Sequence, residues 1–205
     1  MRLKETLESL SAPQAQGPQP GFQSFQLLDA LLTIDREAPI GRKKLSRRLG
    51  VGEGTIRTML QRLKAASLLE VRGKGGCALS RKGKRLVSEL RRRLVDAGPL
   101  SLSLPWEYPE NYAVMVRGAV SRVRRGIEQR DEAIKAGAKA LLVLSYHGGR
   151  LLMPGVADLT AEKPEFASKL IGELKPQEGD VILIAGASTH GEARRGALAA
   201  AQTLL

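Results

Sequence analysis

The stretch "LGVGEGTIRTMLQRL", residues 49–63, places three glycines directly ahead of an apolar pattern that is typical of a helix. Glycines before a helix can form a phosphate-binding loop or the tight turn between two helices. A dinucleotide-binding loop needs Gly-x-Gly-x-x-Gly after a buried strand, and a P-loop ends in Gly-Lys-Ser/Thr. Here the spacing is Gly-x-Gly-x-Gly, and the preceding "RKKLSRRL" is far too charged for a buried strand. The pattern therefore favours the turn of a helix-turn-helix.

Each glycine has a separate role in that interpretation. Gly50 ends a short helix at the position where a left-handed residue costs least. Gly52 is an acceptable N-cap for the next helix. Gly54 lies in the first turn, where a missing side chain lets the helix end approach DNA closely. A recognition helix presents its N-terminal residues to base edges.

The second of these helices has an apolar stripe of Ile56, Met59, Leu60 and Leu63, and its polar face carries base-reading and phosphate-binding residue types. The residues predicted to contact DNA are Lys43, Lys44, Glu53, Thr55, Arg57, Thr58, Gln61, Arg62 and, in a following hairpin, Lys74. Alanine at Arg57 or Arg62 is expected to weaken DNA binding and to leave stability almost unchanged.

The flanking sequence completes a small domain. A helix is expected in "FQSFQLLDALLTID", which begins at residue 22, and "LLEVR" and "CALS" are expected to pair as strands joined by "GKGG". Ser80 is a good N-cap for a fourth helix with a stripe of Leu86, Val87, Leu90 and Leu94.

Residues 43–90 resemble the winged helix-turn-helix of bacterial and archaeal regulators, and "LGVGEGTIRTMLQRL" is similar to the recognition segment of DeoR-type repressors. The whole chain is also similar to a small archaeal family of two-domain winged-helix proteins of uncharacterised function, chiefly through "RDEAIKAGAKALLVLSYHGGRLLMPG". These resemblances imply a winged helix and a transcriptional regulator, but they supply no ligand.

The charge is concentrated in one part of the chain. Residues 22–97 hold 18 Lys/Arg against 7 Asp/Glu, a net charge of +11, whereas residues 98–205 hold 13 against 12, a net charge of +1. A basic block beside a neutral block indicates a module that binds a polyanion, most simply double-stranded DNA, joined to a different domain. The bland alternative is a solvated basic surface, and Arg91–Arg93 are as well explained by the dipole at a helix C-terminus.

Other features of the composition limit the possible cofactors and the location of the protein in the cell. Cys77 is the single cysteine, which excludes a disulfide framework and a cysteine metal site. The N-terminus lacks a signal-peptide pattern, and no apolar run reaches the length of a membrane span. We expect a cytoplasmic protein with no membrane partner, no metal and no cofactor.

Four segments are predicted. Residues 1–21 form an arm that Pro, Gly and Gln favour as disordered, and 22–96 form the winged-helix domain. Residues 97–111 form a linker anchored by Trp106 and Tyr108, and 112–205 form an α+β domain for dimerisation or ligand sensing. In that domain strand, helix, strand, strand, helix, strand and helix follow one another, with "DVILIAG" buried on both faces. This order predicts a two-layer α/β sandwich of the split β-α-β, ferredoxin-like type, and the whole chain is α+β.

One loop of the second half is a candidate for an anionic effector. "GASTHG" follows a buried strand and opens a helix, so its N–H groups could hold an anion with Ser188, Thr189, His190 and Arg194. The alternative is plain helix capping, because Thr189 and Glu192 have capping-box spacing. The stretches 116–126 and 184–196 also share Gly-Ala and Arg-Arg-Gly, which suggests a weak internal repeat. No triad, carboxylate pair or metal-ligand spacing argues for an enzyme.

The sequence thus predicts a DNA-binding transcriptional regulator, and a homodimer whose second domain shifts the spacing of two recognition helices when a ligand binds. Two alternatives stay open: an enzyme with an autoregulatory DNA-binding domain, and a DNA-coating architectural protein.

Overall fold

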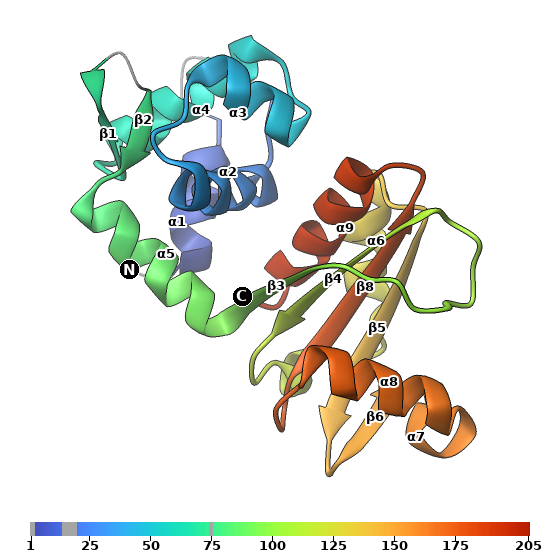
Figure 1. The fold of residues 1–205 in the computed structure, drawn as a ribbon. Coiled ribbons are helices and arrows are strands. Elements are labelled where there is room, and N and C mark those ends of the chain that lie inside the picture. The colour runs from blue at the N-terminus through green and yellow to red at the C-terminus, as the bar shows by residue number, and fades with distance from the viewer. Residues whose placement is uncertain (1–2, 14–19, 74–75) are drawn as a thin grey trace. The chain divides into compact units, whose positions relative to one another are not determined.

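The computed structural model describes residues 3–13, 20–73 and 76–205. The chain divides into two compact units, Met1–Arg91 and Arg92–Leu205 (Figure 1). Each unit combines helices with antiparallel strands, so the predicted α+β class is confirmed.

The first unit is built mainly of helices. Its elements are α1 (Leu3–Ser11), α2 (Ser24–Glu37), α3 (Arg42–Leu49), α4 (Glu53–Ala65), β1 (Leu69–Val71), β2 (Cys77–Leu79) and α5 (Arg81–Arg93), the last ending just past the division. Helix α2 is central, since every residue from Leu27 to Ile34 is buried. Leu45, Ile56 and Leu63 pack into the same core from α3 and α4, as their spacing predicted.

The N-terminal arm differs from its prediction. Helix α1 packs on α2, and Leu7 is fully buried. Within the described residues the helix ends at Ser11, whose hydroxyl donates to the Leu7 carbonyl oxygen at 3.0 Å. The Pro- and Gly-containing residues that suggested disorder begin only after this helix, and positions 14–19 lie outside the described part of the chain.

A third segment joins the β1–β2 hairpin. Strands β1 and β2 pair antiparallel, with Leu69 opposite Leu79. Ile40 pairs with Cys77 through two backbone hydrogen bonds of 3.0 Å, so the chain between α2 and α3 forms a bridge beside β2. A single bridging residue after a proline leaves no strand pattern, which is why the sequence did not reveal it.

The second unit is organised around one antiparallel sheet. Its elements are β3 (Leu94–Pro99), β4 (Glu110–Val116), η2 (Val120–Arg122), α6 (Ile127–Lys135), β5 (Ala140–His147), β6 (Arg150–Met153), β7 (Ala157–Asp158), α7 (Leu159–Glu162), α8 (Pro164–Leu174), β8 (Val181–Ala187) and α9 (His190–Gln202). The strand order is β3-β4-β8-β5-β6-β7. All seven residues of β8 are buried, which confirms the prediction from "DVILIAG".

The domain boundaries differ from those predicted. The expected linker at 97–111 begins inside β3, which pairs with β4, and residues before 97 already belong to the second unit. Gly98 has a φ of +94° at an irregularity of this ladder, and Pro99 follows it. A bulge and a proline break the alternation by which a strand is recognised, so this edge strand resembled a loop in the sequence.

The strand order also corrects the ferredoxin-like prediction. A split β-α-β unit is present, because β4 and β5 lie on either side of antiparallel β8 and are joined through α6. In a ferredoxin-like sheet the third strand of the unit would take the inserted place, but here β6 stays outside β5 and the last strand is inserted. The four-residue β6 is partly exposed, whereas β8 is wholly apolar and gains most from two neighbours.

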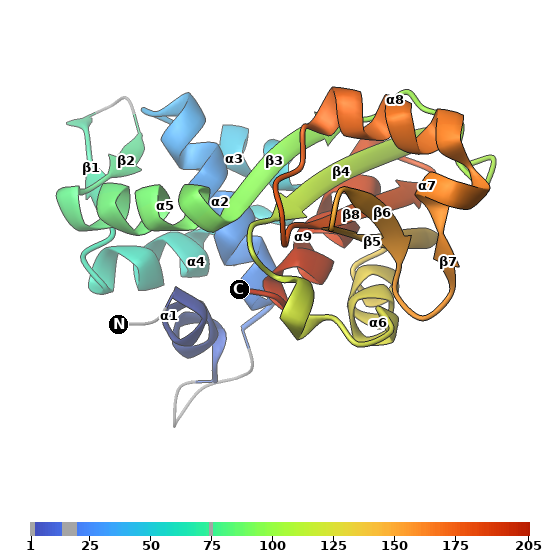
Figure 2. The same cartoon turned by 90° about the horizontal axis from the view of Figure 1, so that it is seen from below.

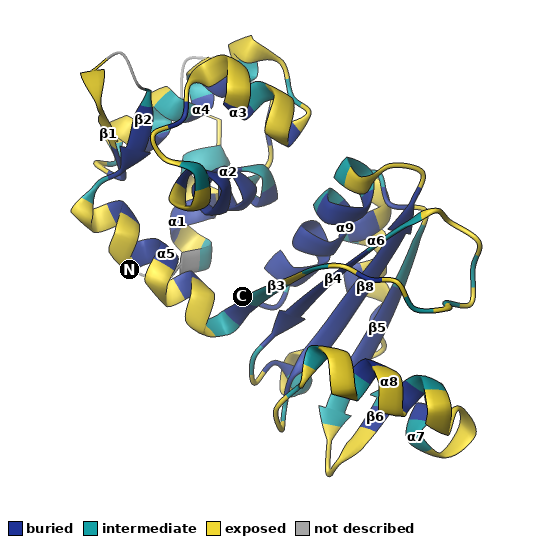
Figure 3. Ribbon diagram, viewed as in Figure 1, coloured by how far each residue is buried: buried dark blue, intermediate teal, exposed yellow. Residues whose placement is uncertain are grey.

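Both faces of the sheet are covered, so the predicted two-layer sandwich is wrong. Figure 2 shows α6 and α8 on opposite sides of the strands, and Figure 3 shows buried strands beside α8, whose outer surface is exposed. Helices α6 and α9 pack on one face, while Ala167 and Leu170 of α8 join the core of the other. Trp106 also lies on that second face, so close to Gly186 that a Cβ there would be 2.5 Å from the indole nitrogen. The segment predicted as a linker is thus part of the domain, and Trp106 anchors it as expected.

Candidate nucleic-acid interface

The turn between α3 and α4 has the geometry that the glycines predicted. Gly50 is left-handed, with φ 64° and ψ 33°, and Gly52 is the extended N-cap of α4. The Ser46 hydroxyl donates to the Val51 carbonyl oxygen at 2.6 Å and fixes the turn from within α3. A Cβ added at Gly54 would meet no atom within 4 Å, so the first turn of α4 is open on that side.

The polar residues of α4 fall into two stripes. Glu53, Arg57 and Gln61 recur every four residues and are exposed. Thr55 faces Gly21 instead, where a Cβ would lie 3.3 Å from the Thr55 hydroxyl oxygen, and Arg62 faces Leu10 and Ala12. Only the first stripe is therefore presented to an external partner along its full length.

Arg62 is a structural residue in this unit. Its guanidinium donates to the carbonyl oxygens of Leu10 at 2.8 Å and Ala12 at 2.6 Å, and it lies over the Phe22 ring at 5.6 Å. These bonds satisfy carbonyl groups at the end of α1 that have no partner within the helix. Arg62 was predicted to read bases because these contacts could not be seen in the sequence. Leu10 lies 52 positions before Arg62 in the chain, and Ala12 lies 50 positions before it.

Replacing Arg62 by alanine is expected to lower the free energy of unfolding by about 1–2 kcal/mol, because two charge-assisted hydrogen bonds are lost, one of them to the half-buried Leu10 carbonyl oxygen. Urea titration of the full chain measures this change. Arg57→Ala is the matched control, expected to change stability by less than about 0.5 kcal/mol. Equal midpoints for the two variants would contradict the docking of α1 on α4.

Several predicted contacts are engaged in ion pairs on the same surface. Lys44 lies 3.0 Å from Glu37, and Glu53 lies 3.4 Å from Arg42. The hydrogen bond from Lys44, reinforced by Arg48, holds the pKa of Glu37 below its usual value despite opposing desolvation. Lys43 is exposed, and the described residues give it no ion-pair partner. Thr58 donates to the Gly54 carbonyl oxygen at 3.3 Å, and Lys74 lies outside the described residues.

Two hollows border the exposed stripe and the hairpin. One, of about 280 Å³, lies between α4 and β1 and is lined by Arg42, Arg57, Leu60, Gln61, Lys64, Leu69, Val71 and Cys77. The other, of about 480 Å³, lies between the hairpin and α5 and is lined by Glu70, Arg72, Leu79, Arg81, Lys84, Arg85 and Ser88. The second hollow, here called the α5 groove, is basic. Its Arg81, Lys84 and Arg85 were not among the predicted DNA contacts, although their spacing places them on one face of a helix.

Cys77 sits under this surface as a core residue. Its thiol donates to the Ile40 carbonyl oxygen at 3.3 Å, and burial raises the pKa of the thiol. Burial therefore disfavours the thiolate, which is the reactive form of a cysteine.

The predicted anion loop of the second unit uses its donors internally. Thr189 accepts from the Glu192 N–H at 3.3 Å and Glu192 accepts from the Thr189 N–H at 3.1 Å, which is a complete capping box. His190 lies 3.8 Å from the Glu110 carboxylate, so an acidic side chain lies beside the loop. Ser188 is exposed, but it has no cation beside it in the described contacts.

Arg194 does not turn toward that loop. It is buried and lies 3.4 Å from Asp96 and 3.2 Å from the Tyr112 hydroxyl, and it joins α9 to β3 and β4. Thr189 thus caps α9 and Arg194 packs between α9 and the sheet, and the arrangement does not favour an anion site there.

Fold and surface together define a two-unit α+β protein whose first unit carries a basic helical face. Residues 26–85 match the family described as "PH0730-like, N-terminal domain", and residues 109–204 match a "Domain of unknown function (DUF4443)". The solved structure "Hypothetical protein PH0730 from Pyrococcus horikoshii OT3" is similar over 89% of this chain and 92% of that chain, with 29% identity and a TM-score of 0.69.

These matches support the similarity of the whole chain to an uncharacterised archaeal two-domain family. They name no activity and lend no support to the DeoR-type resemblance. No curated protein matches this chain. Among the described residues, no helix is both long enough and apolar enough to cross a bilayer.

Proposed function

We propose that the first unit is a winged helix-turn-helix that binds double-stranded DNA, with α4 in the major groove and the β1–β2 hairpin as the wing. The order α2, Ile40 bridge, α3, α4, β1, β2 supports this assignment, since the bridge adds a third segment to the wing sheet. The observation that carries the proposal is the exposed stripe of α4. Arg57 and Gln61 make no hydrogen bond or ion pair with the described residues and have the side chains that read guanine and adenine edges.

Charge around this stripe suits a polyphosphate partner. The net charge of +11 over residues 22–97 supplies attraction that does not depend on sequence. Lys43 and Arg47 are exposed on α3, and Arg81, Lys84 and Arg85 line the α5 groove. In this proposal these cations bind backbone phosphates and position α4, while Arg57 and Gln61 select the bases.

The second unit, with its nearly neutral composition, serves in this proposal for homodimerisation and for sensing a small effector. A ligand that binds one arrangement of the dimer better changes the spacing of the two α4 helices and hence the affinity for DNA. The protein is then a transcriptional regulator rather than an enzyme.

Selection of binding sites from random duplexes with the full chain tests this proposal. A regulator enriches a defined motif, with two half-sites if it binds as a dimer. Retention of all sequences equally would identify an architectural coating protein instead. Failure to retain any duplex at low salt would overturn DNA binding altogether.

Salt dependence provides a second prediction. The slope of log affinity against log salt is expected to be about −0.9 for each phosphate neutralised. Lys84→Ala combined with Arg85→Ala should make the slope shallower by about 1 to 2 if the α5 groove contacts phosphates. Fluorescence anisotropy over a salt series measures it. Lys169→Ala, on exposed α8 of the second unit, is the control that should leave the slope unchanged.

A further inference from the structure

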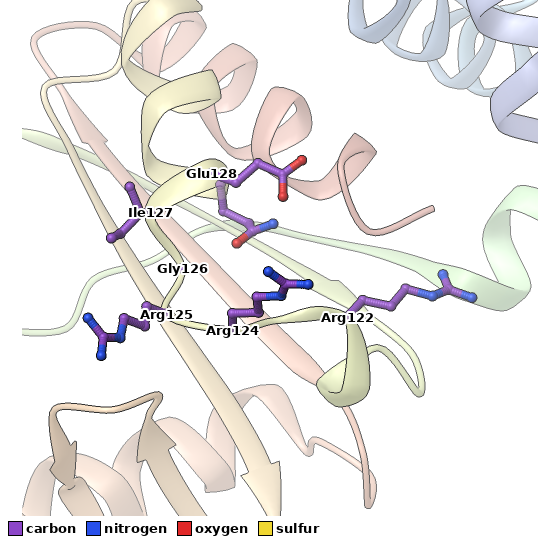
Figure 4. A pocket seen from close by; sticks show the side chains of 7 residues that line it. Arg122, Arg124, Arg125, Gly126, Ile127 and Glu128 are labelled. Carbon is purple, nitrogen blue, oxygen red and sulfur yellow. The ribbon is translucent and has the colours of Figure 1, made fainter.

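A cavity of about 510 Å³ opens at the start of α6 in the second unit. It is lined by Arg122, Arg124, Arg125, Gly126, Ile127, Glu128 and Gln129 (Figure 4). Its volume lies within the range of about 300–1,000 Å³ that is usual for small-molecule sites. The arginines come from the stretch 116–126 that resembled 184–196, but in the second stretch Arg194 and Arg195 lie inside α9. The two loops therefore place their arginine pairs differently.

The three arginines of this cavity differ in their contacts. Arg122 donates to the Leu204 carbonyl oxygen and so holds the C-terminal segment. Arg124 and Arg125 are exposed and make no hydrogen bond or ion pair with the described residues. In Figure 4 the Arg124 side chain reaches toward the first turn of α6, whereas Arg125 extends to the other side of the loop. Arg124 is thus the cation best placed for a ligand at the helix start.

The first turn of α6 adds donors that no side chain occupies. Gly126 is the N-cap, with a φ of 74°, and it provides no side-chain cap for the helix. A side chain there would be strained, because the backbone is left-handed and a Cβ would lie 3.0 Å from Val143. The open N–H groups and the partial positive charge of the helix end therefore face the same space as Arg124.

Gln129 contributes a polar side chain to the cavity wall. The residue is 2% exposed, and its Nε2 donates to the Thr203 hydroxyl oxygen at 2.7 Å. The Thr203 hydroxyl proton is already given to the Ala200 carbonyl oxygen at 2.8 Å, so Thr203 must accept and the orientation of the Gln129 amide is fixed. The Oε1 atom is then an acceptor on a cavity-lining side chain, and no hydrogen bond from the described residues reaches it.

We propose that this cavity binds a small organic phosphate monoester, whose phosphate contacts Arg124 and the first N–H groups of α6 and whose hydroxyl or amino group donates to Gln129 Oε1. The mixture of donors and one acceptor on the cavity wall distinguishes such a ligand from a simple anion. Ile127, 58% exposed at the rim, offers an apolar contact for the rest of the molecule. Glu128 also lines the cavity from the first turn of α6, so the phosphate is proposed on the Arg124 side of the cavity.

Calorimetry on the full chain with adenosine 5′-monophosphate, adenosine and inorganic phosphate tests the proposal. The monophosphate is expected to bind most tightly, inorganic phosphate more weakly, and adenosine without measurable heat. Arg124→Ala should weaken binding of the monophosphate by about ten-fold or more, since one charge-assisted contact is lost. Arg130→Ala is the matched control, because Arg130 is exposed on the same helix but does not line the cavity.

Three results would overturn the proposal: no heat with either phosphate, equal loss in the two variants, or unchanged affinity in Arg124→Ala. The site does not depend on DNA binding by the first unit. If Arg124→Ala lowers affinity for a duplex and neither small phosphate binds, the cavity takes a nucleic-acid phosphate and the small-molecule proposal is wrong.

Discussion

Arg57→Ala is expected to weaken binding of the selected duplex by about 1–3 kcal/mol, which is about 5- to 150-fold in affinity. Arg57 is exposed near the start of α4, one turn after Glu53, and the described residues give it no competing partner. Its guanidinium can bind the two acceptors of a guanine edge at once. The loss should therefore be concentrated at one base position, and duplexes changed at that position should no longer be discriminated.

Anisotropy titrations with the selected duplex and its single-base variants measure both effects. Arg57→Lys keeps the charge and loses the paired geometry, so it should retain non-specific affinity and lose discrimination. Arg62→Ala is the control that distinguishes base recognition from stability, because it should lower the stability of the first unit more than it changes base preference. A uniform loss across all sequences in Arg57→Ala would reassign Arg57 to a phosphate, and wild-type affinity would remove α4 from the interface.

The helices of the first unit were predictable because their stripes are local. Leu45 and Leu49, and then Ile56, Met59 and Leu63, repeat at helical spacing, and the left-handed Gly50 marks the break between them. The division of α4 into two polar stripes was not predictable. It depends on α1 and the Phe22 ring lying against Arg62, and a contact between segments 50 residues apart leaves no periodic signal.

The sheet of the second unit shows the same limit. The sequence of β8 predicts a central strand, because it contains no polar residue that could face solvent. The neighbours of β8 are set by tertiary competition, and the edge strand β3 is concealed by its bulge and proline. The anion loop was predicted without its partners from other strands. Asp96 and Tyr112 contact Arg194 of α9, and Glu110 lies beside His190.

Gly83→Ala is expected to destabilise the first unit by about 1–3 kcal/mol, although Gly83 is in a helix, where alanine is normally the better residue. The reason is the close approach of two backbones. A Cβ at Gly83 would lie 2.1 Å from the Leu68 carbonyl oxygen. That carbonyl cannot move freely, because it accepts the Ser80 N–H at 3.0 Å, and the Gly83 N–H in turn donates to the Ser80 hydroxyl oxygen at 3.0 Å.

The matched control is Gly54→Ala, whose new methyl group meets no atom within 4 Å and should raise stability by about 0.5–1 kcal/mol. Scanning calorimetry of the full chain should then show shifts of opposite sign, with a change of about 4–8 °C for each kcal/mol in a unit of this size. An increase in both variants would mean that α5 is not fixed against Leu68. In that case α5 would not form a rigid wall of the α5 groove. Binding a phosphate would then have to fix the position of the helix, and the free energy needed for this would lower the affinity of the groove for phosphate.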